Sequence, residues 1–326
     1  MEILSFEKRH VPAAVLLVHK AYQSEREKVP CLPLISSTDA LSDLIAGLAG
    51  NGLGVAALDD GKLIGFLTGM AVSEFFGLSR GIYTPLYAHG ATGLDRGQLY
   101  QRMYAAASDS WVKMGHLSHV ITMHAHDSVA VDAWFWQDFG LRCVDSIRPL
   151  IDVLPQGAAD YDIRCIMPGE AGTILELHQE HWRYYQNAPM FMHVHEDVSL
   201  NGIEDWLCEK DHYLWAAFEK ETPVAYMQLR HGGETFVSDD EKSMNICGAY
   251  VKPGQRKSGY GTALLQTIVY WMRESGFERL GVDFESFNID GSRFWRKHFT
   301  PFTYSLTRRI DERTYSNLDN SCGRVL

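Results

Sequence analysis

Residues 251–265 read Val-Lys-Pro-Gly-Gln-Arg-Lys-Ser-Gly-Tyr-Gly-Thr-Ala-Leu-Leu, and they join a predicted strand to a predicted helix. The strand is the apolar segment 244–250, and the helix covers 264–275, where apolar residues recur at helical spacing. Gly259 and Gly261 allow the backbone to turn sharply and to approach a ligand closely. The free N–H groups of a helix's first turn attract anions. The stretch therefore predicts a phosphate-binding loop.

Positive charge gathers in the same loop, because Arg256 and Lys257 precede its first glycine. The loop lacks the Gly-x-Gly-x-x-Gly order of dinucleotide folds and the Walker order. Instead, Arg-x-x-Gly-x-Gly follows a strand that ends in Tyr-Val-x-Pro. This combination resembles the acetyl-coenzyme A loop of the GNAT superfamily of N-acetyltransferases. The alternative is an ordinary glycine-rich turn with two solvated basic residues.

The composition of the whole chain limits the possible functions. Its 326 residues, 46% hydrophobic and 22% charged, are enough for about two globular domains. The net charge of −11 argues against a nucleic-acid partner or an acidic membrane. The six cysteines are widely spaced, which is typical of reduced thiols in a cytoplasmic protein. We expect no signal peptide and no membrane span, because the N-terminus is charged and no long apolar run occurs.

The chain repeats itself with an offset close to 160 residues, which indicates a duplicated domain. The matching pairs are Leu16, Val18 and His19 with Leu175, Leu177 and His178, Ala56-Ala57 with Ala216-Ala217, 111–113 with 271–273, and Phe135-Trp136 with Phe294-Trp295. We place the linker at 154–160 and the domains at 1–154 and 161–326. The family resemblance implies an α/β fold, in which each domain has a mixed, mostly antiparallel and splayed sheet flanked by helices.

The two predicted domains differ at the loop. The first has glycines in residues 88–97 but no Arg-x-x-Gly-x-Gly, and Asp95 places negative charge near the would-be anion site. We therefore expect the first domain to keep the fold and to have lost the cofactor.

The resemblance assigns acetyl-coenzyme A to the second domain. The loop would hold the pyrophosphate, and the edge of the preceding strand would pair with the pantetheine arm. The residues that this assigns to the cofactor are Ala249, Tyr250, Val251, Arg256, Lys257, Ser258, Gly259, Tyr260, Gly261, Thr262, Asn288 and Phe294. Asn288 has an alternative role as a helix N-cap.

Two carboxylates are the candidate catalytic residues. Asp283 and Glu285 lie in a predicted strand, where alternation places them on the face opposite Val282 and Phe284. Some members of the family have a catalytic carboxylate at the position of Asp283. Either carboxylate could accept the proton of an acceptor amine, and the alternative is that both are solvated or structurally paired.

The sequence departs from the family at Trp295. Many members carry a tyrosine there, which protonates the coenzyme thiolate, whereas an indole N–H is not a useful acid. Trp136 is predicted to hold the same place in the first domain. Water or another group would then supply the proton, and Tyr304 is one candidate.

The acceptor is expected near residues 180–197, which follow the first helix of the second domain. Their aromatic and histidine content suits a small-molecule amine, and a peptide amine is the alternative. His178-x-x-His181 and His193-x-His195 have spacings found in metal sites but no third ligand at a suitable distance, so we expect no metal. We expect a monomer or a homodimer.

Three functions remain open on these grounds. The first is acetyl transfer from acetyl-coenzyme A to an amine by direct attack. The second is a regulatory module that binds acyl-coenzyme A without turnover, which the tryptophan at position 295 favours. The third is another phosphate-ligand enzyme that uses the same loop.

Overall fold

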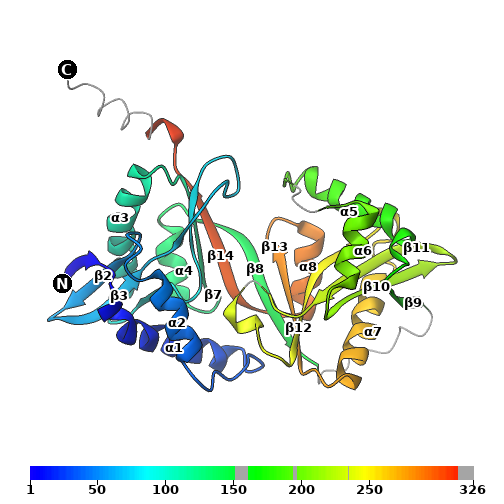
Figure 1. The fold of residues 1–326 in the computed structure, drawn as a ribbon, viewed down its shortest axis with the longest axis horizontal. Coiled ribbons are helices and arrows are strands. Elements are labelled where there is room, and N and C mark those ends of the chain that lie inside the picture. Colours follow the sequence, from blue (N-terminus) through cyan, green and yellow to red (C-terminus); the bar gives the residue numbers. More distant parts are fainter. Residues whose placement is uncertain (151–160, 194–196, 234, 315–326) are drawn as a thin grey trace. The chain divides into compact units, whose positions relative to one another are not determined.

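The chain forms two compact units, each containing a sheet flanked by helices (Figure 1). Unit 1 contains residues 1–144 and 301–326, and unit 2 contains residues 145–300. The computed structural model describes residues 1–150, 161–193, 197–233 and 235–314. Within these ranges, no helix combines the length and apolarity that a membrane crossing needs.

Unit 1 contains two sheets, with strand orders β1-β2-β3-β6 and β4-β5-β7-β14. The pairing is antiparallel throughout except between β5 and β7, which are parallel. Its elements are β1 (Glu2–Ser5), η1 (Lys8–His10), α1 (Val11–Lys28), α2 (Asp39–Leu48), β2 (Val55–Asp59), β3 (Lys62–Leu67), β4 (Met70–Val72), β5 (Gly81–Thr84), β6 (His89–Ala91), α3 (Arg96–Lys113), β7 (Ser118–His124), α4 (Ser128–Phe135) and β14 (Thr300–Arg309).

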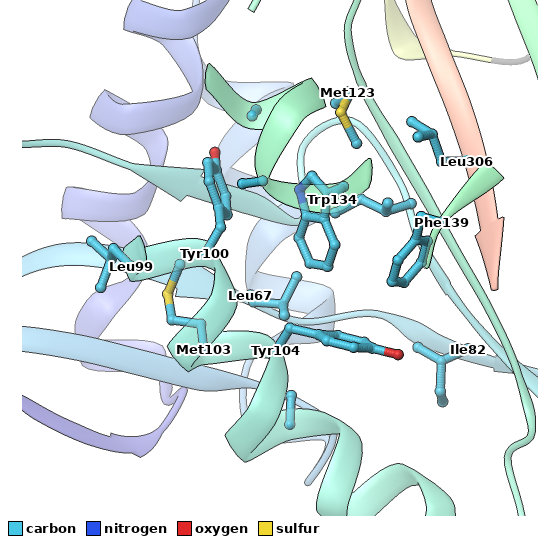
Figure 2. Close-up of a cluster of buried hydrophobic side chains, with 14 of the residues drawn as sticks. Leu67, Ile82, Leu99, Tyr100, Met103, Tyr104, Met123, Trp134, Phe139 and Leu306 are labelled. Atoms are coloured by element: carbon cyan, nitrogen blue, oxygen red, sulfur yellow. The ribbon is translucent and has the colours of Figure 1, made fainter. Parts of the chain in front are cut away.

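The core of unit 1 is built around large aromatic side chains. Trp134 of α4 and Tyr104 of α3 lie edge to face, with ring centroids 5.3 Å apart. Leu306 of β14 packs into the same buried cluster, as Figure 2 shows. Since β14 comes from the end of the chain, the core of unit 1 depends on residues that are far apart in sequence.

Unit 2 contains the strand order β8-β13-β12-β11-β10-β9. The pairs from β12 to β9 are antiparallel, and β12 and β13 are parallel. Its elements are β8 (Gly140–Pro149, whose first residues belong to unit 1), β9 (Asp162–Ile166), η3 (Ala171–Thr173), α5 (Leu175–Gln186), α6 (Leu200–Cys208), β10 (His212–Glu219), β11 (Thr222–Arg230), η4 (Phe236–Ser238), β12 (Ser243–Val251), η5 (Pro253–Gln255), α7 (Tyr260–Glu274), β13 (Arg279–Glu285) and α8 (Ile289–His298).

Helices cover both faces of the sheet of unit 2. On β10, Leu214 and Ala216 pack into the cluster that contains residues of α5 and α6. The intervening Trp215 points the other way and lies 5.8 Å from Trp271 of α7. This alternation fixes α7, and with it the predicted phosphate loop, on the face opposite α5.

The units do not divide the chain where the predicted domains do. The proposed linker, 154–160, lies outside the described residues. The last strand of each predicted domain belongs to the other unit: β8 enters unit 2 at Asp145, and β14 enters unit 1 at Pro301. In unit 1, β14 pairs with β7 from Thr303 to Arg309. Long-range strand pairing of this kind leaves no local trace in a sequence, so the repeat and the Pro/Gly-containing linker indicated a boundary elsewhere.

Candidate functional site

The strands β12 and β13 part at their C-terminal ends. Their parallel pairing runs from Ser243 with Arg279 to Ile246 with Val282, and no later pair is formed in the described part of these strands. At the same point, β12 contains a bulge opposite β11, because Ile246 and Gly248 take successive partners and Cys247 is left over. A bulge bends its strand, so it accounts for the divergence. The predicted splay is present: after Cys247, β12 stays paired with β11 and is no longer paired with β13.

The loop after β12 ends in a helix whose N-terminus has no side-chain cap. Gly259, the N-cap of α7, has a φ of 86°, in the left-handed region that favours glycine. No side chain accepts a hydrogen bond from the first turn at this cap. The first-turn N–H groups, from Tyr260 onward, have no intrahelical acceptor either. Lys257 is exposed nearby and shares the left-handed conformation, with a φ of 66°. The arrangement suits an anionic ligand.

Arg256 braces this loop instead of extending from it. Its Nη1 donates to Asp290 Oδ2 of α8 at 2.7 Å, and its Nε donates to the carbonyl of Val251 at 3.3 Å. The guanidinium also lies 5.0 Å from the centre of the Tyr184 ring on α5. The predicted ligand residue therefore has protein partners, and its guanidinium joins the loop to both neighbouring helices.

A cavity of about 270 Å³ opens beside the N-terminus of α7. Its wall is formed by Tyr161, Gly259, Thr262, Ala263, Gln266, Lys297 and His298. The Tyr161 hydroxyl donates to the carbonyl of Ser258 at 2.8 Å, and the ring lies 5.0 Å from that of Tyr260. Tyr161 and Lys297 were not predicted as site residues, because both lie outside the loop motif. The cavity adjoins the predicted phosphate loop and has a partly apolar wall.

Residues 174–299 match the model of the acetyltransferase (GNAT) family. This segment is a GNAT domain. Among solved structures, the chain resembles a GCN5-related N-acetyltransferase from Sphaerobacter thermophilus, with 13% identity, a TM-score of 0.57 and 95% of each chain covered. It also resembles a GCN5-related glucosamine N-acetyltransferase region of a fungal multi-domain GH3 β-N-acetylglucosaminidase. That likeness has 14% identity and a TM-score of 0.54, and it covers 94% of this chain and 38% of the other. No curated protein matches the chain. These structural likenesses support the mixed α/β fold.

Asn288 of the GNAT domain is a helix N-cap, as the alternative reading predicted. Its Oδ1 accepts from the N–H of Gly291 at 3.1 Å and from the Tyr184 hydroxyl at 3.0 Å. Phe294, one turn further into α8, packs against α7, since a Cβ built on Gly261 would lie 3.5 Å from its ring. The two residues connect α8 with α5 and with the start of α7. Their assignment to the cofactor stays a prediction.

The two candidate catalytic carboxylates lie on one face of β13. Asp283 and Glu285 are partly exposed, whereas Val282 and Phe284 are buried, so the predicted alternation is confirmed. Asn245 Nδ2 donates to Asp283 Oδ1 at 3.0 Å. Asp283 is therefore a structurally paired carboxylate, and its role as a base stays a prediction.

Trp295 of the GNAT domain is a core residue. Its side chain is buried, and its ring centroid lies 4.8 Å from that of Phe294 and 5.6 Å from that of Phe299. Such packing gives Trp295 a structural role in the core of the domain.

One prediction linked to Trp295 is wrong. Trp136 does not repeat it in unit 1, because Trp136 is 72% exposed while Trp134 is 1% exposed. Trp134 follows the N-cap Asp127 by seven residues, just as Trp295 follows Asn288. Tyr304 belongs to unit 1 and packs against its core, and its role as a proton donor stays a prediction.

The histidines with metal-like spacing are bound to a tyrosine. His178 Nδ1 and His181 Nδ1 both lie within hydrogen-bond distance of the Tyr226 hydroxyl, at 3.0 and 2.6 Å. Burial lowers the pKa of His178 to about 4 and that of His181 to about 3, so both rings are neutral at pH 7. The second spacing falls partly on residues 194–196, which lie outside the described residues. The described ranges contain no group of three or more potential metal ligands.

Proposed function

We propose that this chain is an acetyl-coenzyme A-dependent N-acetyltransferase whose GNAT domain acetylates the amine of a small-molecule or peptide acceptor. The observation that carries the proposal is the uncapped N-terminus of α7, with Gly259 and Lys257, directly after a strand that has parted from its neighbour. The N–H groups of the loop would bind the pyrophosphate. The freed edge of β12 would pair with the extended pantetheine arm.

The cavity beside α7 supplies a place for the remaining part of the same molecule. Its wall contains the aromatic ring of Tyr161 and the exposed ammonium group of Lys297. Aromatic and cationic groups suit an adenine ring and a 3′-phosphate, respectively. Acetyl-coenzyme A would supply the activated acetyl group when bound.

Different groups of the GNAT domain would deprotonate the amine and stabilise the oxyanion, and no side chain is assigned to protonate the thiolate. Asp283 or Glu285 would take the proton of the acceptor amine, directly or through water. Backbone N–H groups at the bulged edge of β12 would stabilise the developing oxyanion. A thiol has a pKa near 8.5, which makes its thiolate a tolerable leaving group without a tyrosine at position 295.

Unit 1 is assigned no cofactor in this proposal. Its corresponding helix, α3, is capped by the carboxylate of Asp95, which accepts a hydrogen bond from the N–H of Gln98. We interpret unit 1 as a degenerate copy of the GNAT domain, which follows from the repeated order of elements. A cytoplasmic location fits the free cysteines of the described residues.

Isothermal titration calorimetry with acetyl-coenzyme A tests the proposal directly. The wild type should bind one molecule per chain, and Lys257→Glu should weaken binding about tenfold, because it reverses a charge beside the pyrophosphate. Lys210→Glu is the matched control, since Lys210 is 92% exposed on a loop before β10 and should leave affinity unchanged. Absence of binding in the wild type, or equal affinity in both variants, would overturn the proposed site.

Turnover then separates the enzyme from the regulatory module. Coenzyme A should be released only when an amine is added. Binding without release over a broad panel of amines would favour a sensor that binds acyl-coenzyme A and performs no transfer.

A further inference from the structure

A buried chain of hydrogen bonds crosses from α5 to β11 in the GNAT domain. Trp182 Nε1 donates to His178 Nε2 at 3.0 Å. His178 Nδ1 and the Tyr226 hydroxyl are 3.0 Å apart, and the same hydroxyl lies 2.6 Å from His181 Nδ1. We call these four residues the histidine relay. Only Trp182 in this set is partly exposed.

The direction of the relay is fixed by the tryptophan. An indole N–H can only donate, so His178 Nε2 must accept and the proton of the neutral ring must sit on Nδ1. That Nδ1–H donates to the Tyr226 oxygen, and the Tyr226 O–H donates to His181 Nδ1. His181 is therefore left with its proton on Nε2. The relay makes His181 a hydrogen-bond donor at its outer nitrogen and prevents it from acting there as a base.

Unit 1 shows that the fold does not require the relay. Phe66 pairs with Ala56 on β2 as Tyr226 pairs with Ala216 on β10, and both aromatic side chains are completely buried. Phe66 has no hydroxyl group. Burying a hydroxyl and two imidazoles is costly unless every group is satisfied. The GNAT domain has this polar network at the position where unit 1 has the apolar ring of Phe66. This difference favours a functional role for the histidine relay.

The outer end of the relay lies beside the predicted acyl-transfer site. The His181 ring stacks on that of Tyr250 at 5.2 Å, with an interplanar angle of 25°. Tyr250 belongs to the part of β12 that has separated from β13. His181 Nε2 has no hydrogen-bond partner among the described residues, while His181 belongs to the segment expected to border the acceptor. An N–H donor without a partner at this position is suited to an oxygen atom of a ligand.

We propose that His181 Nε2–H binds an oxygen of the acceptor molecule, and that Tyr226, His178 and Trp182 are positioning residues that hold His181 in the donor form. The acceptor class is then an amine that also carries a hydroxyl, carbonyl or carboxylate oxygen near its amino group. An alkylamine without oxygen would gain nothing from His181. This inference rests on the proposed acetyl transfer, but the relay itself can be measured without it.

Nitrogen-15 NMR of the histidine rings in the ligand-free protein tests the relay. The wild type should show His181 protonated on Nε2 alone. Tyr226→Phe and Trp182→Phe should each give a mixture of both tautomers. Tyr226→Phe removes the hydroxyl that donates to His181. Trp182→Phe removes the N–H that requires His178 Nε2 to accept, so the hydrogen bonds of the relay can then run in either direction. Tyr270→Phe is the control, since this tyrosine is 68% exposed on α7. A wild-type His181 protonated on Nδ1 would overturn the inference.

Kinetics with paired acceptors test the recognition. An amino alcohol and an alkylamine of equal chain length are compared at saturating acetyl-coenzyme A. Tyr226→Phe should raise KM for the amino alcohol about tenfold, with kcat and the KM of the alkylamine unchanged. Equal effects on both acceptors would show a merely structural role. If the wild type acetylates no amine, the proposed function fails together with this recognition step, whereas the NMR result still decides the relay.

Discussion

The helices α3 and α7 hold the same place in the order of elements, yet their N-termini are built in opposite ways. Both end before a glycine with positive φ, Gly115 and Gly276. Counted back from these glycines, α3 has 18 residues and begins three residues earlier than α7, which has 15. The extra turn of α3 starts at the carboxylate cap of Asp95, whereas α7 starts at Gly259, which has no side chain.

The difference concerns the groups that each helix offers to an anion at its N-terminus. An N-terminal carboxylate occupies the positive end of the helix dipole and satisfies an N–H group that a phosphate would otherwise bind. Glycine is not the deciding feature, because the segment before α3 also contains a glycine with positive φ, Gly93. What separates the units is the start of the helix and the charge at its cap.

The largest effect on acetyl-coenzyme A affinity should come from placing a carboxylate, like that of Asp95, at the N-terminus of α7. In Ser258→Asp, the new side chain precedes Gly259 and competes with the pyrophosphate for the N-terminus of α7. We expect acetyl-coenzyme A affinity to fall about 100-fold, about 2.7 kcal/mol, because like charges meet at short range. Calorimetry gives the affinity, and the melting temperature of the free protein should stay constant or rise. Unchanged affinity would mean that the ligand does not use this helix end.

The two α-helices that follow, α4 and α8, also differ in the aspartate that pairs with an arginine near their N-termini. In unit 1, Asp127 caps α4 and accepts two hydrogen bonds from Arg96, each 2.6 Å long. In unit 2, the partner of Arg256 is Asp290, whose side chain is 57% exposed.

We therefore expect Asp127→Ala to lower the free energy of unfolding by about 2 kcal/mol and Asp290→Ala by less than about 0.5 kcal/mol. Urea unfolding of both variants measures this. Equal losses would contradict the view that unit 1 uses these charges for structure.

Buried neutral histidines are a property that the two units share. Burial lowers the pKa of His124 in unit 1 to about 3 and that of His178 in unit 2 to about 4. Below pH 6.5 the unfolded chain gains protons that the folded chain does not accept. The stability that these groups provide is complete above about pH 6.5 and decreases toward pH 4, by about 1.4 kcal/mol per pH unit for each histidine.

His178→Gln and His124→Gln should each reduce the slope of unfolding free energy against pH by about 1.4 kcal/mol per pH unit, which is the contribution of one histidine. Denaturant unfolding between pH 4.5 and 7 would show it. A slope equal to that of the wild type in either variant would mean that the corresponding ring is protonated in the folded protein.

A smaller effect than that of Asp127→Ala should come from removing the carboxylate cap of α3. Asp95→Ala should reduce stability by about 1 kcal/mol, through loss of the bond to Gln98. It should not create a second acetyl-coenzyme A site, because the longer α3 still replaces the loop. Calorimetric stoichiometry checks this. Two molecules bound per chain would show that Asp95 alone blocks a site in unit 1.

Local features of the site could be predicted from the sequence because they depend on neighbouring residues. Glycine and charge marked the loop before α7, and alternation placed Asp283 and Glu285 on one face of β13. The choice between Trp134 and Trp136 was not local, since burial at the end of α4 depends on contacts with Tyr104 and other core rings. The histidine relay was hidden for the same reason. It joins α5 to β11, and only the sheet brings Tyr226 beneath the two histidines.

The positions of β8 and β14 in the chain have a consequence for the synthesis and folding of the protein. Part of β8 belongs to unit 2 although it precedes the second half, and most of β14 belongs to unit 1 although it is translated last. Unit 1 therefore cannot be completed on the ribosome before the second half has been synthesised. Chain halves separated by gene fission or by proteolysis between β8 and β9 would each lack a strand of their own sheet. Because of this exchange, neither half of the chain can be removed without taking a strand from the unit that remains.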